Sequence, residues 1–448
     1  MANPIDASKN APGIQPGSGD FLSRTRVVKS PWMVRVLTFL MVFGPGLIVM
    51  EADNDAGAVS TYTQAGAQYG LKLLWLLIIL LPVTYFCQEM VVRLGIATGE
   101  GHAAMIYQRF GKWWGRFSLF DLQLVNFFTL VTEFAGISLA FAAMGVSPWI
   151  SVPAACAGLV TMVTTGSYLR WERITILLCL LDTAWLVLGW KGGFGAAQVA
   201  RNGLVPSMPD GGLTFDYIFL VIATVGTTIA PWQLFFQQSC VADKKLRFKD
   251  LDASRWDTFI GAVFTIVVAG GMMLVGAILF RNKVAYTDPA QLATVLGPHY
   301  GRFFKSAILM LMVNASILGT TAVSLSSAWA WAEVKGWDHS LQLKFKQAPG
   351  FYLTYIGATM AAAGVVLIPR APLQVIIVGV QVLAGVMLPS ALVFLQIMLN
   401  DKELLGDPFV NRPWNNRVNW TIIALMFALS AVLAAQVLLP GLFPAPAA

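Results

Sequence analysis

Residues 44–70 are GPGLIVMEADNDAGAVSTYTQAGAQYG, the centre of a long apolar segment that carries three carboxylates within five residues. These are Glu51, Asp53 and Asp55. One charged side chain at the centre of a bilayer costs about 2.5–3.5 kcal/mol on insertion scales, so three cost about 8–10 kcal/mol. That sum is comparable to the net stability of a whole protein. A chain would keep such a stretch in lipid only if the acids perform a function.

The composition is that of an integral membrane protein. The chain has 448 residues, of which 57% are hydrophobic and only 12% are charged, and its mean hydropathy is +0.67. Soluble domains carry about a quarter charged residues. A spanning helix needs about 20 apolar residues, and about eleven runs reach that length. Runs this long and continuous favour helices over barrel strands, so we predict an all-α fold. The predicted spans lie near residues 36–66, 71–94, 117–145, 149–167, 174–191, 213–240, 257–281, 304–333, 350–368, 373–399 and 418–440.

The distribution of basic residues predicts the orientation. Lys and Arg concentrate in every second connection, and the richest of these is ADKKLRFKDLDASRW, residues 242–256. Cytoplasmic loops carry this excess, so we expect a multi-pass protein of the cell (inner) membrane with a cytoplasmic N-terminus. Residues 1–35 are polar and are predicted to be a disordered cytoplasmic tail without a cleavable signal peptide. The positive-inside bias explains the net charge of +7, so no nucleic-acid partner is expected.

Cysteine and histidine suggest no metal or disulfide chemistry of their own. No CxxC spacing exists, and the four cysteines lie in or at the ends of apolar spans, where we interpret them as small core residues. The three histidines are predicted to lie in loops. We therefore expect no resident cofactor and no soft transition-metal site in the membrane. These residues are Cys87, Cys156, Cys179, Cys240, His102, His299 and His339.

The three acids predict a break in the first helix. In a continuous helix Glu51 and Asp55 would share a face, and Asp53 would point nearly the opposite way. Unwinding around ADNDAGA, residues 52–58, resolves this conflict, and Gly57 supplies backbone freedom. Unwound backbone is tolerated in a membrane only where it lines a cavity or a ligand. Carboxylate together with free carbonyl oxygen indicates a cation site. The alternative for Asp55 is a buried acid that pairs with a neighbouring helix.

A second break is predicted in the sixth span. Residues 221–239 are VIATVGTTIAPWQLFFQQS, in which Pro231 removes one backbone donor and clashes with the preceding turn. Broken helices that open each half of a chain indicate an inverted-repeat transporter with its site near the midplane. We predict a single transporter domain, 36–448, with repeats at 36–195 and 213–400 and an extra helix at 418–440. The alternative is a proline kink in an ordinary helix.

Residues 44–75 resemble the first helix of the Nramp family of divalent-metal transporters, whose motif there is Asp-Pro-Gly-Asn. The likeness continues through QEMVVRLGIATGEG (88–101), TEFAGISLA (132–140) and the sixth-span stretch, and ends with LNDKELLGDPFVNRPW (399–414). The resemblance implies eleven or twelve helices in the leucine-transporter architecture, alternating access and inward movement of divalent cations.

The three residues that follow Asp55 differ from the family motif. Asp55 falls on the family's metal-binding Asp, but Pro-Gly-Asn is replaced by Ala56, Gly57 and Ala58. The Asn ligand is therefore missing. Asn54, immediately before Asp55, is the candidate replacement, and its alternative role is to cap the half-helix that follows.

Other ligand positions depart as well. Where the family has a metal-coordinating Met just before the proline, this sequence has Ala230. Where the family has two His residues after the proline, this sequence has Trp232 and Gln237. In the third helix Glu133 matches a family acid, whereas Leu130 and Gln123 stand at two other acidic positions. Gln381 in the tenth span matches a polar ligand position.

These replacements predict a harder cation. A thioether favours Mn, Fe and heavier metals over Mg²⁺. Ala230 removes that ligand and leaves room for water, which Mg²⁺ gives up reluctantly. The pattern is similar to that of the Nramp-related magnesium transporters. We predict Mg²⁺ as the main substrate, with Mn²⁺ also accepted, and weak or no proton coupling because candidate proton carriers are lost.

The predicted site residues form two groups. The amides could instead join helices to one another, the acids could form salt bridges, and Glu133 could belong to a structural pair. The candidate metal ligands are Asp55, Asn54, Ala230, Thr228, Gln233 and Gln381. Residues predicted to attract the cation or line its path are Glu51, Asp53, Glu133 and Gln237. Asp182 in the fifth span matches no family position and is expected to face the bundle interior.

Other functions remain as alternatives. One is a proton-coupled Mn²⁺/Fe²⁺ transporter, and another is an amino-acid or amine symporter of the same fold, although three acids would repel a substrate carboxylate. A channel would need filter rings that are absent here. HExxH and GxSxG motifs are absent too, so we do not expect an enzyme. The expected partners of the chain, predicted to be a monomer, are the divalent cation and the lipid bilayer.

Overall fold

The computed structural model describes residues 43–164, 167–209, 212–369 and 371–438. The predicted tail, 1–35, lies outside this range. So do the start of the first predicted span and the last residues of the eleventh.

The all-α fold is confirmed, and no β-strand occurs among the described residues. Each predicted run corresponds to helical structure, with the first, fifth and sixth runs divided in two. The first five are α3 (Pro45–Glu51) with α4 (Ala56–Tyr69), α5 (Leu74–Thr98), α6 (His102–Ala143), α7 (Pro148–Val163), and α8 (Tyr168–Leu181) with α9 (Ala184–Lys191). The rest are α11 (Phe215–Thr228) with α12 (Pro231–Asp243), α13 (Leu251–Arg281), α15 (Arg302–Lys335), α16 (Pro349–Val366), α17 (Leu373–Met398) and α19 (Pro413–Leu438). The boundaries of the two repeats stay a prediction.

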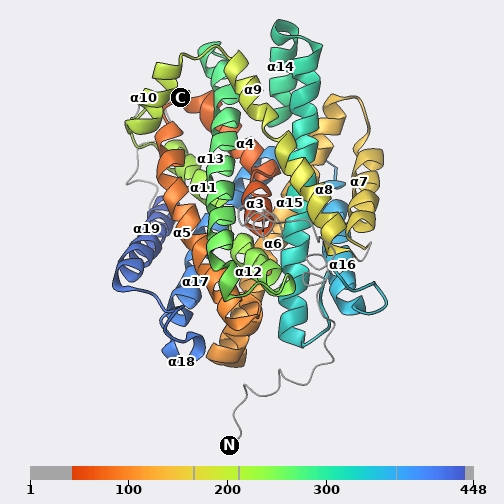
Figure 1. Ribbon diagram of the computed structural model, residues 1–448. Helices are drawn as coiled ribbons and strands as arrows, with labels where there is room; N and C mark the ends of the chain where they lie inside the picture. Colours follow the sequence, from red (N-terminus) through yellow and green to blue (C-terminus); the bar gives the residue numbers. More distant parts are fainter. Residues whose placement is uncertain (1–42, 165–166, 210–211, 370, 439–448) are drawn as a thin grey trace, which may run out of the picture. The chain divides into compact units, whose positions relative to one another are not determined.

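Four short helical elements were not predicted. They are α10 (Ala196–Leu204), the 3-10 helix η2 (Phe248–Asp250), α14 (Pro289–Tyr300) and α18 (Lys402–Leu405). In Figure 1, α10 and α14 lie at one end of the bundle and α18 lies at the other. We call these the α14 end and the α18 end. The apolar runs could not reveal these helices because none of them is long enough to span a membrane.

The broken helices lie inside the bundle. Figure 1 shows α3 at its centre, and α3 and α4 pack against α13, while α6 packs along α15. Of the most apolar window of α15, 89% is buried by the protein, against 22% for α19. Helix α15 is therefore a central element, and α19 is a peripheral one.

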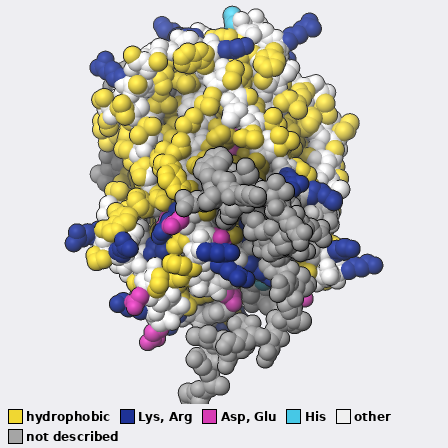
Figure 2. All heavy atoms as spheres, viewed as in Figure 1, with side chains coloured by type: hydrophobic (Ala, Val, Ile, Leu, Met, Phe, Trp, Pro, Cys, Tyr) yellow, Lys and Arg dark blue, Asp and Glu magenta, His cyan; other side chains and the backbone are white. Residues whose placement is uncertain are grey.

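The surface is that of a multi-pass membrane protein. Nine of the described helical segments are long and apolar enough to cross a bilayer. Figure 2 shows hydrophobic side chains covering the middle of the visible face, with Lys and Arg gathered toward its upper and lower margins. This arrangement places apolar side chains against lipid and charges at the two interfaces.

The prediction for the histidines was wrong for two of the three. His102 begins α6 and is fully buried, and its Nδ1 lies 2.9 Å from Gln238 Oε1. His299 lies within α14, and only His339 lies in a loop. The turn between α5 and α6 is only three residues long, so it brings His102 directly into the packed interior. The prediction for the cysteines is confirmed, since all four are buried and unpaired.

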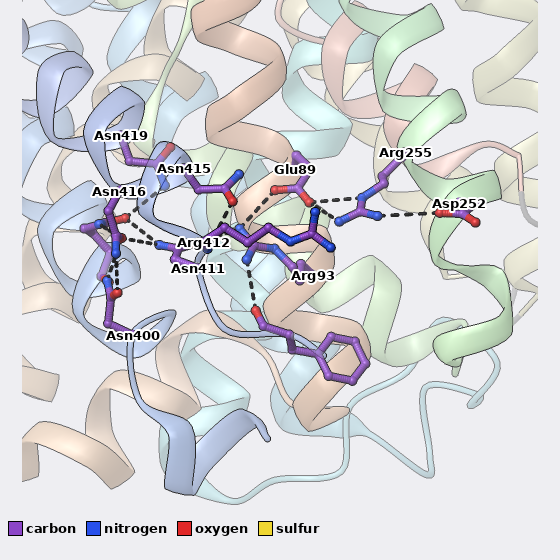
Figure 3. Close-up of polar contacts among 12 residues, drawn as sticks. Glu89, Arg93, Asp252, Arg255, Asn400, Asn411, Arg412, Asn415, Asn416 and Asn419 are labelled. Carbon is purple, nitrogen blue, oxygen red and sulfur yellow. Dashed lines mark hydrogen bonds and ion pairs between the residues drawn. The ribbon is translucent and has the colours of Figure 1, made fainter. Parts of the chain in front are cut away.

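A polar cluster joins α5, α13 and the segment before α19 near the α18 end (Figure 3). Glu89 accepts hydrogen bonds from Arg93 (3.1 Å) and Arg255 (2.8 Å). Arg93 also donates to the Phe409 carbonyl (2.9 Å) and to Asn411 Oδ1 (2.7 Å). One buried carboxylate therefore fixes two arginines and, through them, three parts of the chain.

Candidate metal-binding site

Both predicted helix breaks are present. Helix α3 ends at Glu51 and α4 begins at Ala56, so the backbone of residues 52–55 is not helical. Helix α11 ends at Thr228, and α12 begins at Pro231. The interruption in the first span is narrower than the predicted 52–58.

The role predicted for Gly57 was wrong. Gly57 lies inside α4 and supplies no freedom to the unwound segment. The side-chain nitrogen of Gln381, from α17, instead occupies the space that a Cβ on Gly57 would need, and Asp55 Oδ1 would lie 3.1 Å from that Cβ. The glycine therefore lets the Gln381 amide approach Asp55. Gln381 Nε2 is buried and has no hydrogen-bond partner, so its N–H groups remain free to donate, and a cation could be bound only by the oxygen of this amide.

The two breaks face each other. Tyr62 on α4 and Thr228 on α11 share a hydrogen bond of 2.8 Å between their hydroxyls. The Gln233 side chain, in the first turn of α12, faces the Asp53 carboxyl. Gln233 Oε1 accepts hydrogen bonds from the Ala230 backbone (3.2 Å) and from Gln88 on α5 (3.1 Å).

Each break deprives backbone carbonyls of their helical donors. The Asn54 N–H donates to the Glu51 carbonyl at 2.9 Å, so the Met50 carbonyl loses its usual partner. In the second break the Ala230 N–H bonds to Gln233, and Pro231 has no N–H to offer the Thr227 carbonyl. Carbonyl oxygens of both segments therefore lack their helical donors.

Asp55 and Glu133 share the N-terminus of α4. Asp55 Oδ1 accepts from the Ala58 N–H at 2.9 Å, and Glu133 Oε2 accepts from the Ala56 N–H at 3.1 Å. The two carboxyls also lie within hydrogen-bonding reach of each other. A Cβ on Gly319 of α15 would lie 2.7 Å from both Asp55 Cβ and Glu133 Cδ, so this glycine makes room for the pair. The positive end of the helix favours negative charge here.

Asn54 does not cap α4, because Asp55 holds that position. Asn54 Nδ2 donates to Glu51 Oε2 (3.1 Å) and to the Thr265 carbonyl of α13 (3.2 Å). Asn54 Oδ1 has no partner. The alternative of a salt bridge fails for Glu51 and Asp53 among the described residues, where neither forms an ion pair.

Thr228 and Gln237, predicted to bind the cation or line its path, form hydrogen bonds with other protein groups. The Thr228 hydroxyl donates to the Thr224 carbonyl (2.6 Å) besides meeting Tyr62. Gln237 Nε2 donates to Thr258 on α13 (2.9 Å). Ala230 is buried and contributes only backbone atoms as polar groups.

The structure adds residues that sequence reasoning missed. Tyr62 and Gly319 carry no motif, and only their position against the break shows their role. Gln88 was quoted only as part of a family-like stretch. None of these residues could be assigned without knowing which helices pack together.

The assembled site is buried. Residues 52–55, between α3 and α4, are at most 2% exposed, and Glu133, Gln233 and Gln381 are equally buried. Ala56, on one side, and Pro289, the first residue of α14, line an apolar gap that is too narrow to hold a water molecule. Within the described part of the chain, no group of three or more His, Cys, Asp and Glu side chains forms a metal cluster. The polar groups around the two breaks are instead carboxylates, side-chain amides, hydroxyls and backbone carbonyls.

Comparison with known proteins identifies the family. The Nramp model, described as natural resistance-associated macrophage protein-like, matches residues 46–436. The divalent metal cation transporter MntH of Staphylococcus aureus (strain JH9) is 25% identical over 440 residues, which cover 89% of this chain and 91% of that protein. The crystal structure of the Eremococcus coleocola manganese transporter, in complex with an aromatic bis-isothiourea substituted compound, matches with a TM-score of 0.74. It shares 17% sequence identity and covers 92% of this chain and 89% of that one.

The structural similarity confirms the leucine-transporter-like architecture with broken first and sixth segments. Since the family model matches most of its length, the chain belongs to the Nramp family, whose members are membrane transporters and not enzymes.

Proposed function

We propose that this protein moves divalent metal cations across the membrane by alternating access, with Mg²⁺ as the main substrate and Mn²⁺ as a second one. The single observation that carries the proposal is the meeting of two helix breaks around the Asp55 carboxylate, beside the unpartnered Asn54 Oδ1 and backbone carbonyls that lack their helical donors. Hard cations bind such oxygen donors. The names of the similar S. aureus and E. coleocola proteins, a divalent metal cation transporter and a manganese transporter, support the divalent class.

The preference for Mg²⁺ rests on Ala230. This residue sits at the N-cap of α12, at the edge of the second break, and offers no sulfur. A site with oxygen donors alone gives no advantage to soft metals and suits an ion that keeps part of its water. Asp55, Asn54, Gln233 and Gln381 are the proposed side-chain ligands, the amides through their oxygens, and the carbonyls of the second break complete the set. Gln233 Oε1 would exchange its hydrogen bonds from Ala230 and Gln88 for the ion. In this arrangement the Thr228 hydroxyl positions Tyr62.

Transport requires opening of the closed site to each side in turn. We infer that the α18 end faces the cytoplasm, since the Lys/Arg-rich loop between α12 and α13 lies near it. We also infer weak or no proton coupling, because the side chains of Trp232 and Gln237 on α12 cannot take up or release a proton.

The test is uptake of Mg²⁺, Mn²⁺ and Cd²⁺ into proteoliposomes. Asp55→Asn should abolish uptake of all three, because it removes the negative charge at the α4 N-terminus. Asp121→Asn is the matched control, since Asp121 is a buried acid on α6 that pairs with Ser390 at 2.5 Å. Wild-type rates in Asp55→Asn would refute the site, and uptake of Mn²⁺ without any Mg²⁺ would refute the preference.

A further inference from the structure

A second pair of buried acids lies beside the candidate site. The fifth segment is interrupted between α8 and α9, and Asp182 stands at this interruption with no exposed surface. Its Oδ1 accepts a hydrogen bond from Asn314 Nδ2 on α15 at 2.9 Å. Its Oδ2 is buried and has no partner.

Glu51 is the other member of the pair. Helix α3, which ends at Glu51, packs against α8, and Asp182 directly follows the last residue of α8, so the two acids lie on neighbouring helices, where their negative charges disfavour each other. Glu51 Oε2 accepts hydrogen bonds from Asn54 and from the Thr265 hydroxyl (3.4 Å), whereas Oε1 has no partner.

Within the described ranges, no basic side chain pairs with either carboxyl. The ion pairs of the described residues include neither Glu51 nor Asp182. Burying an ionised carboxylate without a cation costs several kcal/mol, and two such groups side by side cost more. The pair therefore needs either a proton or a positively charged ligand.

Two amide side chains point to the ligand. Asn54 and Asn314 each direct their NH₂ group at one of the acids, and the carbonyl oxygen of each amide is buried without a partner. Asn54 is fully buried and Asn314 is 93% buried (7% exposed). With the amides in these orientations, protonation of the acids would leave both amide oxygens unsatisfied, at a cost of about 1–3 kcal/mol each. A cation bound by both carboxylates and both amide oxygens would satisfy all four groups.

We propose that Glu51, Asp182 and the amide oxygens of Asn54 and Asn314 form a second subsite for a hard divalent cation. This inference rests on the proposed function and makes the subsite a second stop for the transported ion. Two carboxylates carry the charge that neutralises a divalent ion, and all four donors are oxygens of the kind that Mg²⁺ and Mn²⁺ accept. Asn54 lies between Glu51 and Asp55 in the unwound segment, so it joins the two subsites. Adjacent weak sites let an ion enter and leave by steps.

The number of bound ions tests the proposal. Purified protein is titrated with Mn²⁺, and the free ion is counted by electron paramagnetic resonance, with Mg²⁺ as competitor. Wild type should bind two ions per chain, and Asp182→Asn and Asp55→Asn should each bind one. Asp121→Asn should keep two. Glu51→Gln should match Asp182→Asn, which guards against a folding defect in one variant, and size-exclusion profiles verify folding in all of them.

The outcomes separate the two proposals. One ion in wild type, or two in both Asp182→Asn and Glu51→Gln, would overturn the second subsite and leave the Asp55 site intact. Loss of the second Mn²⁺ when NaCl replaces choline chloride at equal ionic strength would assign the subsite to Na⁺ and also overturn the divalent proposal. No Mn²⁺ or Mg²⁺ bound by wild type would refute the proposed function itself.

Discussion

The side-chain amide of Gln381 rests directly on Gly57, in the space that any other residue at position 57 would fill with its Cβ. This contact joins α17 to the first turn of α4 and brings the amide beside the Asp55 carboxylate. Substitution at Gly57 should therefore act on the proposed ligands and leave the rest of the bundle unchanged.

Gly57→Ala should reduce metal uptake to background, because the new methyl group displaces the Gln381 amide from Asp55. The matched control is Gly364→Ala in α16, where a Cβ would meet nothing within 4 Å. Uptake into proteoliposomes and melting temperature are measured for both. If Gly57→Ala transports normally, the Gln381 amide is no ligand.

Ala230→Met should shift the preference toward softer metals. The thioether would reach into the second break and favour Cd²⁺ over Mg²⁺. The measurement is the concentration of Cd²⁺ that halves Mg²⁺ uptake, which should fall in the variant. Ala230→Leu, with similar bulk and no sulfur, is the control, and an equal fall in both variants would contradict the explanation.

Asp257→Asn should loosen α3. Asp257 Oδ2 accepts from the Gly46 N–H at 2.7 Å, and Oδ1 accepts from Gly44 and Leu47 at 3.2 Å each. A carboxylate in this position stabilises a helix N-terminus by about 0.5–2 kcal/mol. Amide exchange in α3 should become about tenfold faster, which corresponds to about 1.4 kcal/mol.

The control for this prediction is Asp252→Asn, which changes an exposed acid on the same helix α13 and should leave α3 exchange unchanged. Unchanged exchange in Asp257→Asn would show that packing alone holds α3 against α13.

Glu89→Gln should destabilise the polar cluster near the α18 end (Figure 3). The change leaves Arg93, whose side chain is 4% exposed, without its carboxylate. We expect a loss of about 2 kcal/mol, below the roughly 3–5 kcal/mol for fully buried pairs, because Arg255 is partly exposed. Thermal unfolding in detergent measures the change. Asp407→Asn, in a pair whose side chains are largely exposed, should have no effect, and equal losses would count against the cluster.

Metal entry should not carry protons with it. A pH-sensitive dye inside proteoliposomes should report no acidification during Mg²⁺ uptake, and an imposed pH gradient should leave the rate unchanged. Glu133 is the described acid in contact with Asp55, so Glu133→Gln is the informative variant. Acidification in wild type that disappears in Glu133→Gln would replace our prediction with proton coupling through this pair.

The sequence predicted the membrane-spanning helices and the breaks in the first and sixth of them. Apolar length decides which segments cross a bilayer, and this property is local, so every predicted span has its helix. The acids around Asp55 and the ring of Pro231 are also local features, because each makes continuous helix costly in lipid whatever surrounds it. The proposed preference for a hard cation rests on the same residues, since Asp55 would supply an oxygen ligand and Ala230 would supply no sulfur.

Tertiary structure decided which residues meet at the breaks and what their roles are. Gly57 was expected to relax the backbone, yet it admits Gln381, a residue more than 300 positions away. The interruption between α8 and α9 at Asp182 contains no proline or glycine, so the sequence does not predict it. The proposed role of Asp182 depends on α3 and α15, which carry Glu51 and Asn314. Contacts of this kind depend on the packing of distant helices, whose energy is shared over many weak interactions that no single stretch of sequence records.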